Sequence, residues 1–220
     1  MFHTPRRVQL GAIKGSLSYK IFHVQGEPED GWKERYVERI EANSFTPLTP
    51  EDEDEISEGW VPIDRPLQLE FDLYSVLFDH YINLGFRQDR YSIPKALLKA
   101  HVAEAEYEYM VENDKEELSK FERDDIKAMV KMELKEQQLP KMRVIDVSWD
   151  LHAGVVRFWS QTNKLCETFQ GYFQDTFGLK ILPANPYINA VESGLGEEKV
   201  EMLQDVEPTN FVEGLAGVEA

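Results

Sequence analysis

Two neighbouring stretches in the middle of the sequence, residues 94–113 and 116–138, repeat apolar residues at helical spacing. Ser92 and Pro94 favour a helix start, because serine accepts a hydrogen bond from an unpaired amide and proline fits the first turn. The apolar positions are Leu98, Val102, Ala105 and Tyr109, then Ile126, Met129, Val130 and Leu134. Asn113 and Asp114 weaken the helix between the stretches. The pattern predicts a helical hairpin, and one long kinked helix is the alternative.

Segments with strand patterns lie on both sides of this hairpin. Before it, we expect strands at residues 16–24, 59–62, 67–77 and 81–93, with a helix at 29–42. After it, residues 144–149 and 155–159 are predicted to pair as a β-hairpin, and a strand at 179–182 closes the unit. Between them, a helical face contains Leu165, Phe169, Phe173 and Phe177, and Gly178 suits a left-handed helix end.

The predicted fold class is α+β. It combines a mainly antiparallel sheet with a long charged helical hairpin and a C-terminal β-hairpin–helix–strand unit. A chain of 220 residues suffices for one substantial core. We expect a flexible N-terminus at 1–14, one domain at 15–187 and an acidic, mostly disordered tail at 188–220. A short docking segment in that tail, around Met202, Leu203, Phe211 and Val212, is the alternative.

The formal net charge of -17 argues against nucleic-acid binding at first sight, since such binding depends on cations that neutralise phosphates. The acidic residues, however, are concentrated in two segments. Residues 41–72 contain ten acids and only Arg65 as a base, and residues 186–220 contain eight acids and only Lys199. The rest of the chain is therefore nearly neutral, and a nearly neutral body can carry a basic face.

The sequence lacks the motifs that usually support catalysis. It contains no Gly-rich phosphate loop, HExxH pair, GxSxG elbow or Cys-x-x-Cys pair. The acidic run 52–55 lacks the spacing of an EF-hand loop, and we expect His23, His101 and His152 to be structural or exposed and the single Cys166 to be buried. We therefore predict a protein that is not an enzyme and has no cofactor. The absence of a secretory signal and of a membrane-spanning apolar run predicts a cytoplasmic location.

Cations recur every four residues in the second helical stretch, at Arg123, Lys127, Lys131 and Lys135. On a helix this spacing forms a basic ridge beside the apolar stripe, and Lys141 and Arg143 extend it. The ridge could follow a phosphate backbone without reading bases. The alternative is a solvated helix whose charges form intrahelical ion pairs. A second basic cluster contains Arg6, Arg7 and Lys14, unless these residues belong to a merely soluble terminus.

Several phrases of the sequence, in order, resemble the RdgC-type recombination-associated proteins, in particular their short variants. The matching phrases are residues 15–24 (GSLSYKIFHV), 45–48 (FTPL), 59–62 (GWVP), 93–94 (IP), 139–141 (LPK), 144–150 (VIDVSWD) and 177–183 (FGLKILP). Together they extend over about residues 10–187. The chain is shorter than full-length members and more acidic than a dedicated DNA clamp.

The resemblance implies a cytoplasmic, nucleoid-associated protein that binds double-stranded DNA with little sequence preference and restrains RecA-type recombinases. Full-length family members are described as ring-shaped homodimers, so a homodimer is expected. A second hypothesis is an acidic protein-interaction or DNA-mimic module that binds a recombination or nuclease partner through segments 41–72 and 186–220. A hydrolase without a known motif is a third, and strand loss with magnesium or manganese would reveal it.

Overall fold

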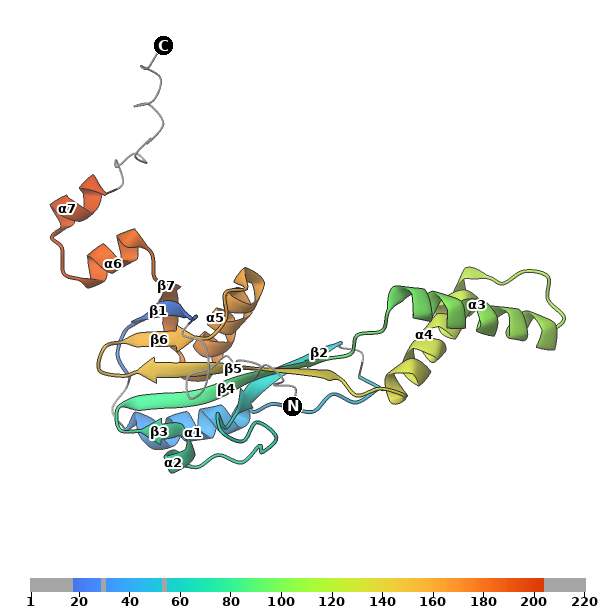
Figure 1. Ribbon diagram of the computed structural model, residues 1–220, viewed down its shortest axis with the longest axis horizontal. Coiled ribbons are helices and arrows are strands. Elements are labelled where there is room, and N and C mark those ends of the chain that lie inside the picture. The colour runs from blue at the N-terminus through green and yellow to red at the C-terminus, as the bar shows by residue number, and fades with distance from the viewer. Residues whose placement is uncertain (1–17, 29–30, 53–54, 204–220) are drawn as a thin grey trace, which may run out of the picture.

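The computed structural model describes residues 18–28, 31–52 and 55–203 of the chain. These residues form an α+β structure in which seven strands make one antiparallel sheet, in the order β2-β4-β5-β6-β1-β7, with β3 paired to β4 (Figure 1). The strands are β1 Lys20–Gln25, β2 Ile56–Val61, β3 Leu77–Phe78, β4 Tyr81–Arg90, β5 Lys141–Asp150, β6 Val155–Phe158 and β7 Lys180–Pro183. The helices are α1 Trp32–Ala42, α2 Leu73–Val76, α3 Lys95–Glu112, α4 Lys120–Glu136, α5 Asn163–Phe177, α6 Pro186–Glu192 and α7 Glu197–Met202.

The main core lies between one face of the sheet and helices α1 and α5. The apolar face of α5 is buried as the sequence predicts, and it consists of Leu165, Phe169, Phe173 and Phe177. The ring of Phe169 stacks on that of Phe158 in β6 at a centroid distance of 4.1 Å. Gly178 ends α5 with a φ of 73°, which confirms the predicted left-handed stop. This aromatic face attaches the C-terminal half of the chain to the sheet.

Helices α3 and α4 form an antiparallel hairpin, the arm, which projects from the far ends of β4 and β5 (Figure 1). The arm confirms the predicted helical hairpin, because residues 113–119 lie outside both helices and turn the chain between them. It has a separate small core, formed by Leu118, Ile126, Val130 and Leu134 with Leu98, Val102, Ala105 and Tyr109 packed against them. No helix in the described ranges is both long and apolar enough to cross a membrane.

Two predictions made from apolar patterns are wrong. Met129 was expected in the core of the arm but is 52% exposed, because it points about 100° away from the neighbouring buried Val130. Residues 67–77 were expected to form a strand but contain an irregular segment and the short helix α2. Phe71 and Val76 in this segment both pack on the main core, so their burial does not require an extended strand. Asp72 starts α2 instead, since its carboxylate accepts a 2.7 Å hydrogen bond from the Ser75 amide.

The start of the region predicted to be a disordered tail forms helices α6 and α7. Asn185 caps α6 by accepting a hydrogen bond from the Ile188 amide at 2.8 Å. His23 of β1 and Asn189 of α6 are joined by a side-chain hydrogen bond of 2.9 Å, which connects α6 to the sheet. Met202 and Leu203 lie at the end of α7, whereas Phe211, Val212 and the rest of 204–220, like the N-terminal 1–14, lie outside the described residues.

Candidate nucleic-acid interface

A capping box at the start of α4 orients the helix that carries the predicted basic ridge. The Ser119 amide donates a hydrogen bond of 2.9 Å to a Glu122 carboxylate oxygen, and the Glu122 amide donates one of 3.3 Å to the Ser119 hydroxyl. Lys115, from the turn between the helices, forms an ion pair with the same carboxylate. The hydrogen bond from Lys115, followed by those from Ser119, lowers the pKa of Glu122 to about 2. The Glu122 carboxylate therefore connects the turn between the helices to the first residues of α4.

Two of the predicted ridge residues are exposed on the arm and have no partner among the described residues. Arg123 and Lys127 are exposed on the outer side of α4, one helical turn apart. In the described ranges neither of them makes an ion pair or a side-chain hydrogen bond. Cations of this kind can approach a phosphate backbone without breaking an internal contact.

The other two ridge residues are engaged by the acidic segment before β2. Lys131 forms an ion pair with Glu55, and the hydrogen bond from Lys131 lowers the pKa of that carboxyl. Lys135 is only 5% exposed, and its Nζ donates a 2.8 Å hydrogen bond to the backbone carbonyl of Asp52. The ammonium of Lys135 also lies 5.4 Å from the ring centroid of Tyr91. The expected exposed ridge of four cations is therefore wrong for Lys135, which has a structural role.

A second group of cations lies at the base of the arm, where β4 and β5 extend beyond the main core. Arg90 of β4 is directly opposite Lys141 of β5, and Arg143 follows two residues later on the same face. All three side chains are exposed. Lys141 donates a 3.3 Å hydrogen bond to the Ser92 hydroxyl, whereas Arg90 and Arg143 make no ion pair within the described part of the chain. We call Arg90, Lys141 and Arg143 the neck cations.

Arg90 was missed by the sequence analysis. It is the last residue of β4, on the opposite face of the strand from Arg87, three residues earlier. Arg87 is mostly buried: its guanidinium pairs with Asp89 at 2.5 Å and lies 3.9 Å from the ring centroid of Phe45. Arg87 is buried because Pro66 and Phe45, which lie far from it in the sequence, cover its face of the strand, and the local pattern does not reveal these contacts.

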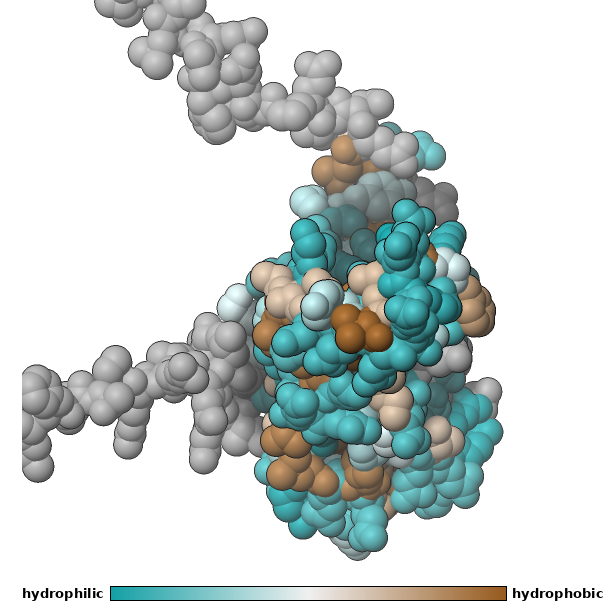
Figure 2. Space-filling view, turned by 90° about the vertical axis from the view of Figure 1, so that its right-hand side faces the viewer, coloured by the Kyte–Doolittle hydropathy of each residue, from teal (hydrophilic) through white to brown (hydrophobic). Residues whose placement is uncertain are grey.

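The surface on the side of the arm is mainly polar. Figure 2 looks at the molecule from the side toward which the arm points and shows mostly hydrophilic side chains, with apolar ones in separate small groups. No continuous apolar surface dominates this view. A side of this kind favours electrostatic contact over the burial of apolar area.

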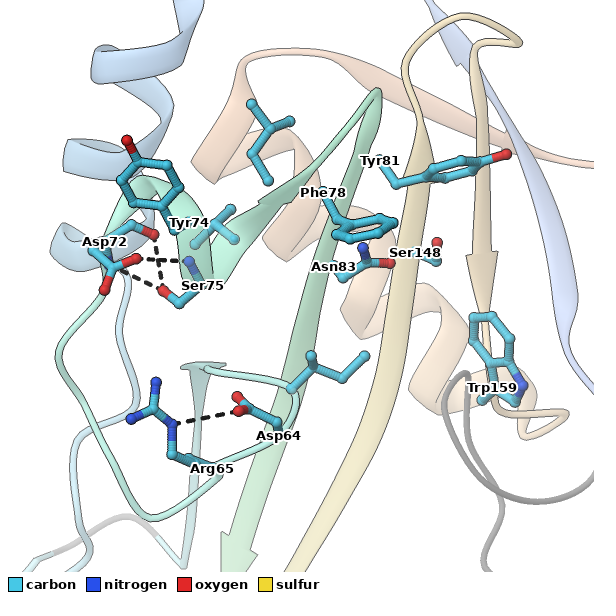
Figure 3. A pocket seen from close by; sticks show the side chains of 13 residues that line it. Asp64, Arg65, Asp72, Tyr74, Ser75, Phe78, Tyr81, Asn83, Ser148 and Trp159 are labelled. Carbon is cyan, nitrogen blue, oxygen red and sulfur yellow. Dashed lines mark hydrogen bonds and ion pairs between the residues drawn. The ribbon is translucent and has the colours of Figure 1, made fainter.

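An open pocket of about 720 Å³ lies elsewhere, beside α2, β3 and the face of the sheet that α1 and α5 leave uncovered (Figure 3). Aromatic side chains surround it, namely Tyr74, Phe78, Tyr81 and Trp159. Some of its polar groups are engaged: Ser75 donates a 2.8 Å hydrogen bond to the Asp72 carbonyl, and Arg65 pairs with Asp64 at 3.4 Å. The pocket suits an apolar or aromatic group of a partner better than a phosphate, because its two carboxylates outnumber its single guanidinium.

The remaining reactive side chains have structural contacts. Cys166 is buried as predicted, and burial raises the pKa of its thiol. His152 stacks on His80 at a centroid distance of 4.3 Å, and Nδ1 of His80 lies 2.6 Å from an Asp79 carboxylate oxygen. Within residues 18–28, 31–52 and 55–203, no three His, Cys, Asp or Glu side chains are grouped so that they could hold a metal ion.

In comparisons with known proteins, the sequence matches no family model and no curated protein. The resemblance to RdgC-type proteins therefore rests on the phrases of sequence between residues 15 and 183.

Proposed function

We propose that this protein is a non-enzymatic, sequence-independent double-stranded DNA-binding protein that modulates recombination by restraining a RecA-type recombinase. The observation that carries the proposal is the set of exposed cations, on the arm and at its base, that form no ion pair with any carboxylate of the described residues. These are Arg123, Lys127, Arg90 and Arg143, together with Lys141. Nucleoid association and a homodimer follow from the resemblance and belong to the same proposal.

The chemistry of these cations favours backbone contact over sequence reading. Side chains that contact phosphates position a protein on the duplex but carry no base information. Each neutralised phosphate releases counterions, so the logarithm of the affinity falls with the logarithm of the salt concentration by about 0.9 per contact. An anionic protein of net charge -17 can bind in this way only through a local cationic surface.

Binding of a fluorescent duplex, measured by anisotropy over a series of salt concentrations, tests the proposal. Two duplexes of unrelated sequence should bind with similar affinity. The variant Arg123→Glu/Lys127→Glu should bind both more weakly and with a flatter salt dependence. The matched control is Lys164→Glu/Lys180→Glu, which reverses two exposed cations on α5 and β7 and should leave binding nearly unchanged. If both variants lose duplex affinity equally, the loss is caused by the change in net charge and not by the arm.

The recombinase part of the proposal has its own test. RecA-type filament growth on a duplex with a single-stranded gap should slow when the protein is present and should recover in the Arg123→Glu/Lys127→Glu variant. If a variant that cannot bind DNA still slows filament growth, the protein does not act by occupying the duplex.

A second candidate function is protein interaction through the open pocket. The observation that favours it is the exposure of Tyr74 and Phe78 beside Asp64 and Asp72, since exposed aromatic groups are typical of interface centres. A tight complex with a recombinase or nuclease in the absence of DNA, lost in Tyr74→Ala/Phe78→Ala, would support this function. Salt-dependent duplex affinity that this substitution leaves unchanged supports the DNA-binding function.

A further inference from the structure

The acidic segment before β2 is held across the base of the arm at both of its ends. We call its described residues, Glu51, Asp52 and Glu55, the acidic strap. On one side, Lys135 of α4 donates a 2.8 Å hydrogen bond to the carbonyl of Asp52, whose carboxylate also accepts a local hydrogen bond from the Thr49 amide. On the other side, the amide of Tyr91 donates a 3.2 Å hydrogen bond to the carbonyl of Glu55, and Ile56 pairs with Arg90 at the start of β2. The strap is thus placed by backbone contacts beside the basic side of α4.

The strap offers these cations the same kind of ligand that DNA would offer. Glu55 supplies an anionic oxygen to Lys131, and the Asp52 carbonyl supplies a second acceptor to Lys135. A phosphate oxygen of DNA is likewise an anionic hydrogen-bond acceptor. The two lysines lie one helical turn apart, on the segment of α4 nearest to the neck cations.

We propose that the acidic strap is a built-in competitor of DNA, in which Glu55 occupies Lys131 and keeps it from contacting a phosphate. This inference rests on the DNA-binding function proposed above and adds its regulation. The strap restrains duplex affinity, and it is displaced when a phosphate takes the place of the Glu55 carboxylate.

The contacts of Lys131 with Glu55 and of Lys135 with the Asp52 carbonyl differ in burial, and this difference determines which of them a phosphate can replace. The Lys131 and Glu55 side chains are 37% and 57% exposed, so water already reaches their ion pair. Exposed pairs of this kind contribute little to stability, and a phosphate can replace one partner at low cost. Lys135 is buried under the strap and beside Tyr91, so it stays in place. The competition therefore acts through the contact between Glu55 and Lys131.

Glu55→Gln tests the inference, because it removes the competing charge and retains the size of the side chain. In the anisotropy titration it should strengthen duplex binding by about 1.5- to 5-fold, the range expected for one exposed ion pair. The salt slope should stay nearly the same, because Lys131 contacts the same phosphate in both complexes once the Glu55 carboxylate is displaced. The matched control is Glu136→Gln, which removes an exposed α4 carboxylate that makes no ion pair with a described residue. Glu136→Gln should leave duplex affinity nearly unchanged.

The same titration with Lys131→Gln completes a double-mutant cycle. In that background Glu55→Gln should have no effect on affinity or salt slope. If wild type binds the duplex and Glu55→Gln binds it identically, the strap does not compete, although the DNA-binding function stands. If Glu55→Gln still increases duplex affinity in the Lys131→Gln background, the increase comes from the change in net charge, and the inference is wrong. If neither wild type nor Glu55→Gln binds any duplex at low salt, the proposed function fails together with its regulation.

Discussion

The indole nitrogen of Trp60 donates a hydrogen bond to the hydroxyl oxygen of Thr176, 2.9 Å away, inside the main core. Both residues are fully buried. The Thr176 hydroxyl in turn donates a 2.8 Å hydrogen bond to the carbonyl of Tyr172, one turn earlier in α5. The edge strand β2 is thereby connected to the helix that covers the sheet.

Thr176→Val should therefore destabilise the protein. Valine has nearly the same shape but leaves the Trp60 indole without an acceptor, which costs about 1–3 kcal/mol of the free energy of unfolding. Urea denaturation followed by tryptophan fluorescence measures the difference. Thr168→Val, on the same helix but at a less buried position, should change stability by no more than about 0.5 kcal/mol. Equal effects of the two substitutions would argue against a role of the buried hydrogen bond.

Gly59→Ala should be strongly destabilising. A Cβ atom at this position would lie 2.3 Å from the Cα of Phe45, and backbone cannot move away as a side-chain tip can. Overpacking of this kind costs about 1–3 kcal/mol or more. Gly171→Ala is the comparison, because a Cβ there meets no atom within 4 Å and alanine favours the helix by about 0.5–1 kcal/mol. We expect thermal melting to show opposite shifts for these two alanines.

Acid should loosen the start of α4 through Glu122. Its pKa is about 2 in the folded protein and 4.5 in the unfolded chain, so its contribution is present above pH 4.5. As pH falls from 4.5 through about 2, the carboxyl becomes protonated and that contribution is lost. The Ser119 amide resonance, which reports the hydrogen bond to Glu122, should shift over this window in an NMR titration.

The Glu122→Gln variant should remove this shift and lower hydrogen-exchange protection in the first turn of α4 at neutral pH. Glu133→Gln, an exposed substitution later in the same helix, serves as the control and should retain the shift. A Ser119 amide that titrates identically in both variants would show that another carboxyl causes the change.

The neck cations should contribute to duplex binding independently of the arm. Replacing Arg90 and Arg143 by alanine removes two exposed guanidinium groups and should flatten the salt dependence by about 1.8, which corresponds to two phosphate contacts. The loss should add to that of Arg123→Glu/Lys127→Glu, because the two groups share no contact in the described structure. Arg87→Ala should lower stability instead, since it leaves the buried Asp89 carboxylate unpaired. If the salt dependence of Arg90→Ala/Arg143→Ala equals that of the wild type, these two neck cations do not contact DNA.

Local periodicity was sufficient to predict the helical hairpin, the buried face of α5 and the β5–β6 hairpin. Each of these features depends on residues within a few turns or one tight connection of each other. The apolar repeat of Leu165, Phe169, Phe173 and Phe177 specifies a helix face whichever sheet it meets. Segment 67–77 is the exception, because its alternating apolar residues reach the main core from an irregular segment and the short α2.

The state of each candidate cation, in contrast, depends on residues far away in the sequence. Lys131 meets Glu55 across 76 positions and Lys135 meets Asp52 across 83. Arg90 and Lys141 come together only through the pairing of β4 with β5. The spacing of four residues correctly placed Arg123, Lys127, Lys131 and Lys135 on one helix, because helical geometry is local. It could not reveal which of them an acidic strap would neutralise, because charge pairing follows distance in space.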